Sequence, residues 1–480
     1  GSLYFSANDT FTQSADGDLT ADGTAAGADI TVEAGGAITM TDGAVTTTNG
    51  GNIRYNSSGD AVALGQLTTT TRGGNVYVNA GSGSITDAGD TGGEDIFTGG
   101  LILKSTASLG SASDALEIDT VNLSTDSDGT TDGTFLLESN AVTVDSVTVA
   151  TNYGFTGSAS NSGNTSETQE DLNSGNHLVL RTTDGSITVN VGTNSDDPAV
   201  DALGRILLKT GESEESTDAK IEFNTVLVES GEASTNAGAI TLDSADDLTL
   251  LNGSKASVLG NDNTTGNLVA LVAGDLTMEG NSPSSIFETV NNADIYLNIN
   301  GDAALGLVDA GTGNIRLEVG GLVTDNSDDA PTSRDLAASS LLVDAGDKNA
   351  GGLGTSSNAI ETSATTIALR GGNGGIFLEG ETSLTVSDVT VSFRAVGADG
   401  TLATAVSRSL SDVLTSGNGD IVIRAKDGDM VLNDGTNPDD DLAVQAGGSG
   451  NLLLEAIADG TNLTANAAVQ SGTGDLTLKA

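Results

Sequence analysis

The feature that most constrains this chain is a short repeat of paired apolar residues. Three pairs begin at Ile30, Ile53 and Val76, at equal spacing, and in each pair the second apolar residue follows at i+2. Alternation at i, i+2 is the period of a β-strand. Short strands at fixed places in a unit of about 20–25 residues are typical of a β-solenoid. The sequence therefore predicts an all-β fold, a parallel β-helix, with almost no helix.

Gly-rich segments introduce later strands of the same kind. They stand before Ile315, Ile376, Ile421, Leu452 and Leu476, and the gaps between them become shorter along the chain. We interpret these gaps, in order, as three coils, two coils, one coil with an insertion and one coil. Residues 157–176 and 211–219 are expected to loop out as insertions.

Within each strand the aliphatic residues are expected to point inward and stack on their counterparts in the next coil. Their polar neighbours are expected to face solvent, where β-branched Thr suits a strand. The exposed set is expected to include Thr188, Thr241, Thr249 and Thr477.

A longer repeat is superimposed on the short one. Segments 174–200 and 416–444 share the order of Gly, Asp, Asn and apolar residues, and 141–149 matches 383–391. Several other blocks match in the same order and with nearly the same offset, which is close to half the length of the chain. The sequence therefore predicts two diverged copies of one module, residues 1–240 and 241–480, joined as a continuous rod without a linker.

The charge excludes several classes of partner. The chain has 17 Lys and Arg against 67 Asp and Glu, a formal net charge of −50. Nucleic acid binding needs clustered basic residues, so we expect no nucleic acid partner. The chain has no Cys and a single His, which leaves no thiolate or multi-His metal site. No run of about 18 apolar residues is present, so no membrane insertion is expected.

Acidic pairs at the predicted corners are the candidate metal ligands. Asp196 and Asp197 in the first module match Asp439 and Asp440 in the second. Carboxylates are suitable ligands for Ca²⁺. The alternative is that these residues are solvated loop charges. We expect no cofactor other than Ca²⁺.

Catalysis is not expected. The Gly-rich segments do not continue into a phosphate-binding motif, and corner glycines of a solenoid explain them better. Two aspartates could act as a glycosidase pair, but two similar modules do not define one cleft. The alternative from another class is a carbohydrate-binding or carbohydrate-cleaving β-helix.

The segments SGNGDIVIRAKDGDMVLNDG and AGGAITMTDG resemble the repeats of bacterial filamentous-haemagglutinin-like adhesins and related giant surface proteins. The resemblance implies a right-handed parallel β-helix that is secreted and located at the cell surface. It also implies a structural segment of an extracellular filament or adhesin, acidic and without catalysis. The expected partner is the chain itself, as a continuing array or an end-to-end stack, with host or cell-surface glycans as a second class. A Ca²⁺-dependent S-layer or matrix protein is a further alternative.

Overall fold

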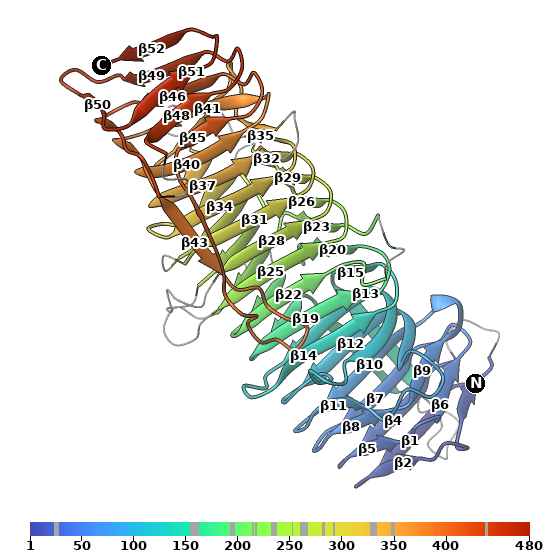
Figure 1. The fold of residues 1–480 in the computed structure, drawn as a ribbon. Coiled ribbons are helices and arrows are strands. Elements are labelled where there is room, and N and C mark those ends of the chain that lie inside the picture. Colours follow the sequence, from blue (N-terminus) through green and yellow to red (C-terminus); the bar gives the residue numbers. More distant parts are fainter. Residues whose placement is uncertain are drawn as a thin grey trace. The chain divides into compact units, whose positions relative to one another are not determined.

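The computed structural model describes the chain except residues 24–27, 154–162, 193–196, 214–215, 217, 232–237, 252, 260–266, 281–283, 291–292, 327–333, 347–350 and 437–439. The described residues form parallel strands that pair from coil to coil, which confirms the prediction of a parallel β-solenoid. Contacts divide the chain into two compact units, Gly1–Ser230 with Val396–Thr401, and Gly231–Ala395 with Leu402–Ala480. Figure 1 shows the strands of each unit lying one above the other.

The first unit begins with three rows of strands, one for each side of the coil. The first row comprises β1 (Leu3–Ala7), β4 (Ile30–Ala34), β7 (Ile53–Ser57), β10 (Asn75–Ala80), β12 (Ile96–Ser105) and β13 (Leu116–Ser127). The second row comprises β2 (Phe11–Gln13), β5 (Ile38–Met40), β8 (Val62–Leu64) and β11 (Ile85–Asp87). The third row comprises β3 (Leu19–Ala21), β6 (Val45–Thr48) and β9 (Gln66–Thr69), and it continues into the start of β12.

A hairpin interrupts the first unit and changes its rows. The hairpin consists of the antiparallel strands β16 (Val147–Tyr153) and β17 (Gly163–Gln169). The long strand β13 pairs with strands on both sides of this insertion. The three rows that follow comprise β14 (Gly133–Glu138), β19 (His177–Thr182) and β22 (Arg205–Lys209); β15 (Val142–Val144), β20 (Ile187–Asn190) and β23 (Ile221–Asn224); and β18 (Leu172–Ser174), β21 (Val200–Ala202) and β24 (Leu227–Ser230).

The second unit also begins with three rows. The first comprises β25 (Ala239–Ser244), β28 (Leu268–Val272), β31 (Ile295–Ile299), β34 (Asn314–Val319), β37 (Ser340–Ala345) and β40 (Thr366–Gly371). The second comprises β26 (Leu248–Leu251), β29 (Leu276–Met278), β32 (Ala303–Leu305), β35 (Leu322–Asp325) and β38 (Gly352–Leu353). The third comprises β27 (Lys255–Val258), β30 (Ile286–Thr289), β33 (Leu307–Asp309), β36 (Leu336–Ala337) and β39 (Ile360–Thr362), and the last two rows meet in β41 (Gly375–Gly380).

A second hairpin, β43 (Val389–Phe393) with β44 (Val406–Leu410), interrupts this unit in the same way. Here β40 pairs with strands on both sides of the insertion, as β13 does in the first unit. The remaining strands comprise β42 (Leu384–Val386), β47 (Met430–Leu432) and β50 (Leu463–Ala465); β45 (Val413–Thr415), β48 (Leu442–Ala446) and β51 (Ala468–Ser471); and β46 (Ile421–Ala425), β49 (Leu452–Ala456) and β52 (Leu476–Lys479).

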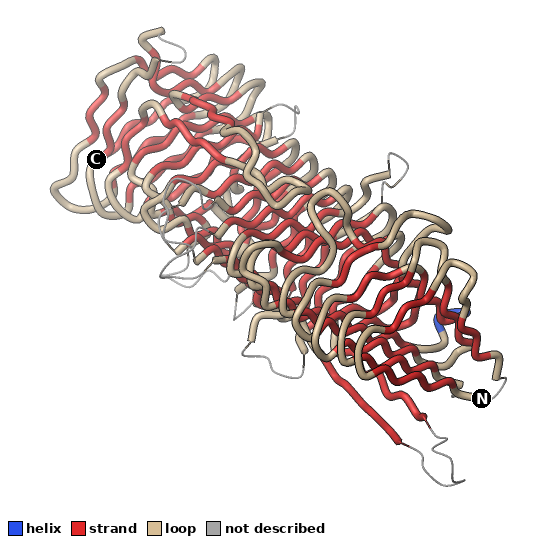
Figure 2. Tube along the Cα trace, turned by 90° about the horizontal axis from the view of Figure 1, so that it is seen from below, coloured by secondary structure: helices blue, strands red, loops and turns tan. Residues whose placement is uncertain are grey.

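The coil length agrees with the short repeat in the sequence. Ile30 pairs with Ile53 and Ile53 pairs with Val76, so the spacing of these apolar pairs is one coil. The side chains of these three residues are fully buried, and each contributes an apolar layer to the interior. Among the described residues the only helix is the single 3₁₀ turn η1 (Thr70–Arg72), which Figure 2 shows among the strands. No helix in the described ranges is long and apolar enough to cross a membrane.

Three expectations about the coils were wrong. Ile315 pairs with Leu341 and Leu341 with Ile367, whereas Ile376 pairs with Leu353 in another row, so Ile315 and Ile376 are not three coils apart. Ile376 pairs directly with Ile421, so the gap between them is one coil that contains the second hairpin, not two coils. Residues 157–176 are not simply a loop, because they include β17 and β18. The gap between Ile421 and Leu452 is one coil, as predicted. Parts of 211–219 lie outside the described residues.

The expected exposure of the Thr residues holds for Thr477, which is exposed, and in part for Thr188 and Thr249, which are partly exposed. It was wrong for Thr241, which is buried. Thr241 pairs with Val269 in the next coil, and Val269 lies in an apolar cluster with Phe393 of the second hairpin. The outward side of a strand is therefore buried where a hairpin covers it.

Asp and Asn recur at the corners because their side chains connect successive coils. Asp29 Oδ1 accepts a hydrogen bond from Asn52 N at 2.8 Å, and Asn52 Oδ1 accepts from Asn75 N at 2.7 Å. The second unit repeats this arrangement with Asp247, Asp275 and Asp302. Backbone amides at a corner lack a ladder partner, and a side-chain oxygen satisfies them. Many of the acidic residues are therefore structural corner residues.

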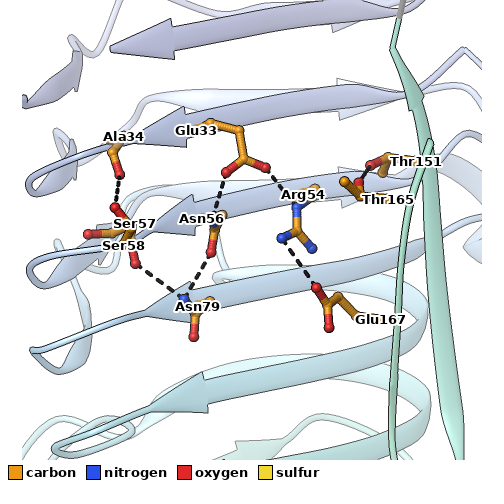
Figure 3. Close-up of polar contacts among 10 residues, drawn as sticks. All are labelled: Glu33, Ala34, Arg54, Asn56, Ser57, Ser58, Asn79, Thr151, Thr165 and Glu167. Carbon is orange, nitrogen blue, oxygen red and sulfur yellow. Dashed lines mark hydrogen bonds and ion pairs between the residues drawn. The ribbon is translucent and has the colours of Figure 1, made fainter. Parts of the chain in front are cut away.

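Each hairpin lies across the outward side of the first strand row of its unit (Figures 1 and 3). Val147 and Val149 of β16 pack against Tyr77 and Ile102 in the first unit. Asn52 Nδ2 donates to the carbonyl of Ala150 at 2.6 Å. In the second unit Val389, Val391 and Leu410 pack against Leu342 and Ala368. The face of each hairpin that meets the strand row is therefore apolar, and it buries apolar side chains of that row.

Candidate metal sites

The structure places the predicted ligands only in part. Asp196 and Asp439 lie outside the described residues. Asp440 is exposed and forms a group with Asp412 and Asp434, in which one oxygen from each carboxyl group lies within 4.8 Å of the others. Asp440 therefore lies in a group of three carboxylates, with partners that the sequence did not indicate, and its role as a Ca²⁺ ligand stays a prediction.

Asp412 is the buried member of this group. It directly follows the second hairpin, and its carboxyl group accepts hydrogen bonds from Ser411 Oγ at 3.2 Å and from the amide of Gly435 at 3.3 Å. Burial raises the pKa of Asp412 to about 6, and the nearby charges of Asp440 and Asp434 act in the same direction. A cation at this place would relieve that repulsion.

Asp197 has a comparable neighbour in the first unit. Asp171 directly follows the first hairpin, and burial raises its pKa to about 6, with further contributions from Glu170 and Asp197. Among the described residues, however, Asp197 is not one of three carboxylates that meet within ligand distance. Of the two described members of the predicted pairs, Asp440 therefore lies in such a group and Asp197 does not.

A second kind of carboxylate group was not predicted, and it occurs in both units. In the first unit Asp87, at the end of β11, meets Asp95 and Glu117. Asp95 is 3% exposed, and one of its oxygens accepts a hydrogen bond from the amide of Glu117 at 3.1 Å. Burial, followed by the hydrogen bond with Asp87, raises the pKa of Asp95 to about 10. Asp95 is therefore protonated at neutral pH unless a cation replaces the proton. Asp87 also meets Asp90 and Asp114 in an adjoining group.

The second unit has the matching group at the equivalent place, made of Asp325, Asp335 and Glu361. Asp335 is fully buried and accepts a hydrogen bond from the amide of Glu361 at 2.9 Å. Burial, then the hydrogen bond with Asp325, raises the pKa of Asp335 to about 9. Lys426 Nζ lies 3.8 Å from Glu361, so this group already has one cationic neighbour.

The groups around Asp95 and Asp335 share the same set of oxygen donors. Each holds three carboxyl groups, of which the central one is buried at a corner between successive coils. Such oxygens are hard donors, which suit Ca²⁺ and would need carbonyl or water oxygens to complete its shell. Without a cation, a proton shared between two carboxyl groups satisfies the same oxygens. The groups can therefore exchange a proton for a cation.

A sequence signal for these groups exists. The segment LGSASDALE (109–117) ends at Glu117, and LGTSSNAIE (353–361) ends at Glu361. Gly110 and Gly354 both adopt positive φ, 62° and 67°, at the same turn. The shared LG…A…E pattern locates the Glu of each group.

No family model, no curated protein and no solved structure matches this chain.

Proposed function

We propose that the chain is a structural segment of an extracellular filament or giant surface adhesin, at the bacterial cell surface, without a catalytic role. The observation that carries the proposal is repetition: both units have the same strand rows, the same interrupting hairpin and the same carboxylate group. An architecture that repeats as a module suits a tandem structural array better than a single reaction site.

The proposed partner is the chain itself. In β52 Leu476 and Leu478 are 42% and 43% exposed, and β52 pairs along one edge with β49. A parallel strand from a further coil, in the same array or in a second copy, would pair along the other edge and cover both leucines.

Electron microscopy of the purified chain, with and without millimolar Ca²⁺, tests this proposal. We expect particles joined end to end. Leu476→Asp combined with Leu478→Asp should abolish the joining, while Val290→Asp, at a side chain that is 50% exposed away from β52, should leave it intact. Separate particles in both conditions would contradict self-association, and equal joining by all variants would contradict the role of β52.

A second candidate function, a Ca²⁺-dependent surface-layer or matrix protein, has one specific observation in its favour. This observation is the pair of matched carboxylate groups around Asp95 and Asp335. This candidate would be favoured if end-to-end joining requires Ca²⁺ and if the double variant Asp87→Asn with Asp325→Asn no longer joins. Joining that is unchanged by chelators would exclude it.

A further inference from the structure

The two hairpins use equivalent apolar contacts. Val147 and Val149 of the first hairpin correspond to Val389 and Val391 of the second, at the offset of the long repeat. In both units these valines cover apolar side chains on the outward side of the first strand row. Apolar packing of this kind depends on area and shape, so it does not distinguish one hairpin from the other.

The charges of the two hairpins are opposite at the same place. Glu167 lies opposite Val149 in the first hairpin, and Arg408 lies opposite Val391 in the second. Figure 3 shows Glu167 pointing from the hairpin toward Arg54. The two atoms Glu167 Oε1 and Arg54 Nη2 are 3.5 Å apart.

The strand rows under the hairpins have the complementary charges. In the first unit Arg54 has a side chain that is 7% exposed, and Glu33 Oε1 lies 2.8 Å from its Nε. In the second unit Arg408 makes ion pairs with Glu318 and Asp344, whose side chains are 16% and 6% exposed. The strand-row members of these pairs are largely buried, whereas the side chains of Glu167 and Arg408 are 40% and 36% exposed. Like charges would therefore repel at this place, with part of the repulsion screened by solvent.

The arginine and the aromatic residue that stack on the strand row also occur in opposite order in the two units. Arg54 lies over the ring of Tyr77, which is in the next coil, with 4.3 Å between the guanidinium carbon and the ring centroid. In the second unit the aromatic residue comes first, and Arg316 lies over Tyr296 at 4.5 Å. The rings of Tyr296 and Phe393 stack with centroids 3.9 Å apart, so the hairpin contributes a second aromatic ring to this contact.

We propose that these exchanged charges make each hairpin specific for the strand row of its own module, and that they prevent hairpins from exchanging between modules or between neighbouring copies. This inference does not depend on the proposed function. Repeat proteins are prone to misassembly between similar modules, and specificity between similar surfaces is commonly achieved by a repulsive contact in the wrong pairing.

Both wrong pairings place like charges together. The first hairpin on the second strand row would bring Glu167 to Glu318 and Asp344, of which Glu318 is already paired with Arg316. The second hairpin on the first strand row would bring Arg408 to Arg54, which is already paired with Glu33. Lys104 adds a positive charge to this wrong arrangement, although its Nζ lies 3.3 Å from Asp126 Oδ2. In the strand register Lys104 is opposite Asn79, and Asp344 is opposite Glu318 at the equivalent place. The equivalent position is therefore positive in one unit and negative in the other.

The test compares charge reversal with neutral substitution in the full chain. One variant carries Glu167→Arg and Arg408→Glu, and the control carries Glu167→Gln and Arg408→Gln. Hydrogen exchange is measured at Val389–Phe393 and Val406–Leu410, and separately at the underlying strands β34 and β37. We expect hairpin exchange at least about tenfold faster in the reversed variant than in the neutral one, because it adds repulsion to the lost ion pair. After refolding from denaturant, the reversed variant should form hairpin-exchanged dimers and the neutral variant should remain monomeric.

A rescue variant separates charge from simple loss of folding. Asp344→Lys, the residue that the first module has at this place, should restore protection of the hairpin that carries Arg408→Glu. Equal hairpin exchange and equal dimer content in the reversed and neutral variants would overturn the proposal. Failure of the rescue, with β34 and β37 still protected, would also overturn it.

Discussion

Asp171 and Asp412 occupy the same place in the two units. Each directly follows its hairpin, each has a φ of 69°, and the carbonyl of each accepts a hydrogen bond from the long strand that spans the insertion. The donors are the amides of Thr125 and Leu369, at 2.9 and 2.8 Å. The return from a hairpin to its coil therefore requires left-handed backbone, which Asp and Asn tolerate better than other residues with a Cβ.

This backbone predicts a difference between two substitutions of Asp412. Asp412→Ala should lower the free energy of unfolding by about 1–2 kcal/mol, because Ala in the left-handed region is strained. Asp412→Asn should cost less, since Asn adopts this conformation and keeps both acceptor and size. Denaturant unfolding of the two variants measures the difference. Equal losses would mean that the backbone conformation at this place is not limiting.

The buried carboxyl groups predict that stability falls as the pH rises. The pKa values of Asp95 and Asp335 in the folded chain, about 10 and about 9, are above that of an unfolded aspartate. Their contribution is therefore complete below the pKa of an unfolded aspartate, about 4, and is lost progressively as the pH rises from there through 9 to 10. Denaturant unfolding measured between pH 5 and 10 in the presence of a chelator should show this decline.

Substitution of one carboxyl group separates this effect from the general charge. Asp95→Asn should unfold within about 0.5 kcal/mol of the native chain near pH 4, because the amide replaces a protonated carboxyl group as donor and acceptor. At pH 7 it should be the more stable chain, because unfolding of the native chain lets Asp95 ionise. It should also lose less stability than the native chain up to pH 10. Asp16→Asn, at an exposed position, should leave the pH profile unchanged. A profile that is the same in all three chains would exclude Asp95 as a source of the decline.

A polar network inside the first coils predicts the effect of a single hydroxyl group. The side chain of Tyr55 is fully buried, and its hydroxyl is 2.7 Å from Thr46 Oγ1 and 2.9 Å from Gln13 Oε1. Tyr55→Phe should lower the free energy of unfolding by about 1–2 kcal/mol, because it leaves buried polar atoms with fewer partners. Thermal unfolding of Tyr55→Phe measures this loss, and a gain in stability would show that the hydroxyl is not needed.

The corner ladder predicts that acceptor oxygens matter more than charge. Asn52→Ala should cost about 1–3 kcal/mol, because the amide of Asn75 then has no acceptor. Asn52→Asp keeps the oxygen, although both variants lose the hydrogen bond to the carbonyl of Ala150. It should therefore cost less than Asn52→Ala, despite the nearby charge of Asp29. Unfolding in high salt, which screens that charge, should bring Asn52→Asp closer to the native chain. The opposite order of the two variants would show that the charge dominates.

The fold could be predicted because apolar residues alternate at i, i+2 within each strand and this pattern recurs once per coil. Ile30, Ile53 and Val76 are spaced by one coil and pair with one another, as expected. The hairpins could not be found in this way, because Val147 and Val389 show the same strand pattern as the coils. A hairpin also lengthens the coil that contains it, and the lengthened coil that ends at Ile421 was interpreted as two coils.

The candidate sites were predicted less well because they depend on the register between coils. Asp440 was identified from a run of acidic residues, but its partner Asp412 lies in a different coil. Asp95 and Glu117 are separated by about one coil in the sequence, and only this spacing brings them together. Once the coil length is known, acidic residues one coil apart are the ones to examine.

The hairpins impose an order on folding. Most strand pairs join residues one coil apart, so a growing solenoid extends by adding each coil to a finished neighbour. The hairpin contacts are different, since Asn52 and Ala150 are 98 positions apart and Asn267 and Arg394 are 127 apart. A hairpin contacts strands of several coils, and these contacts require strands that have already paired. We therefore expect the hairpins to dock late in folding, after the coils that they cover.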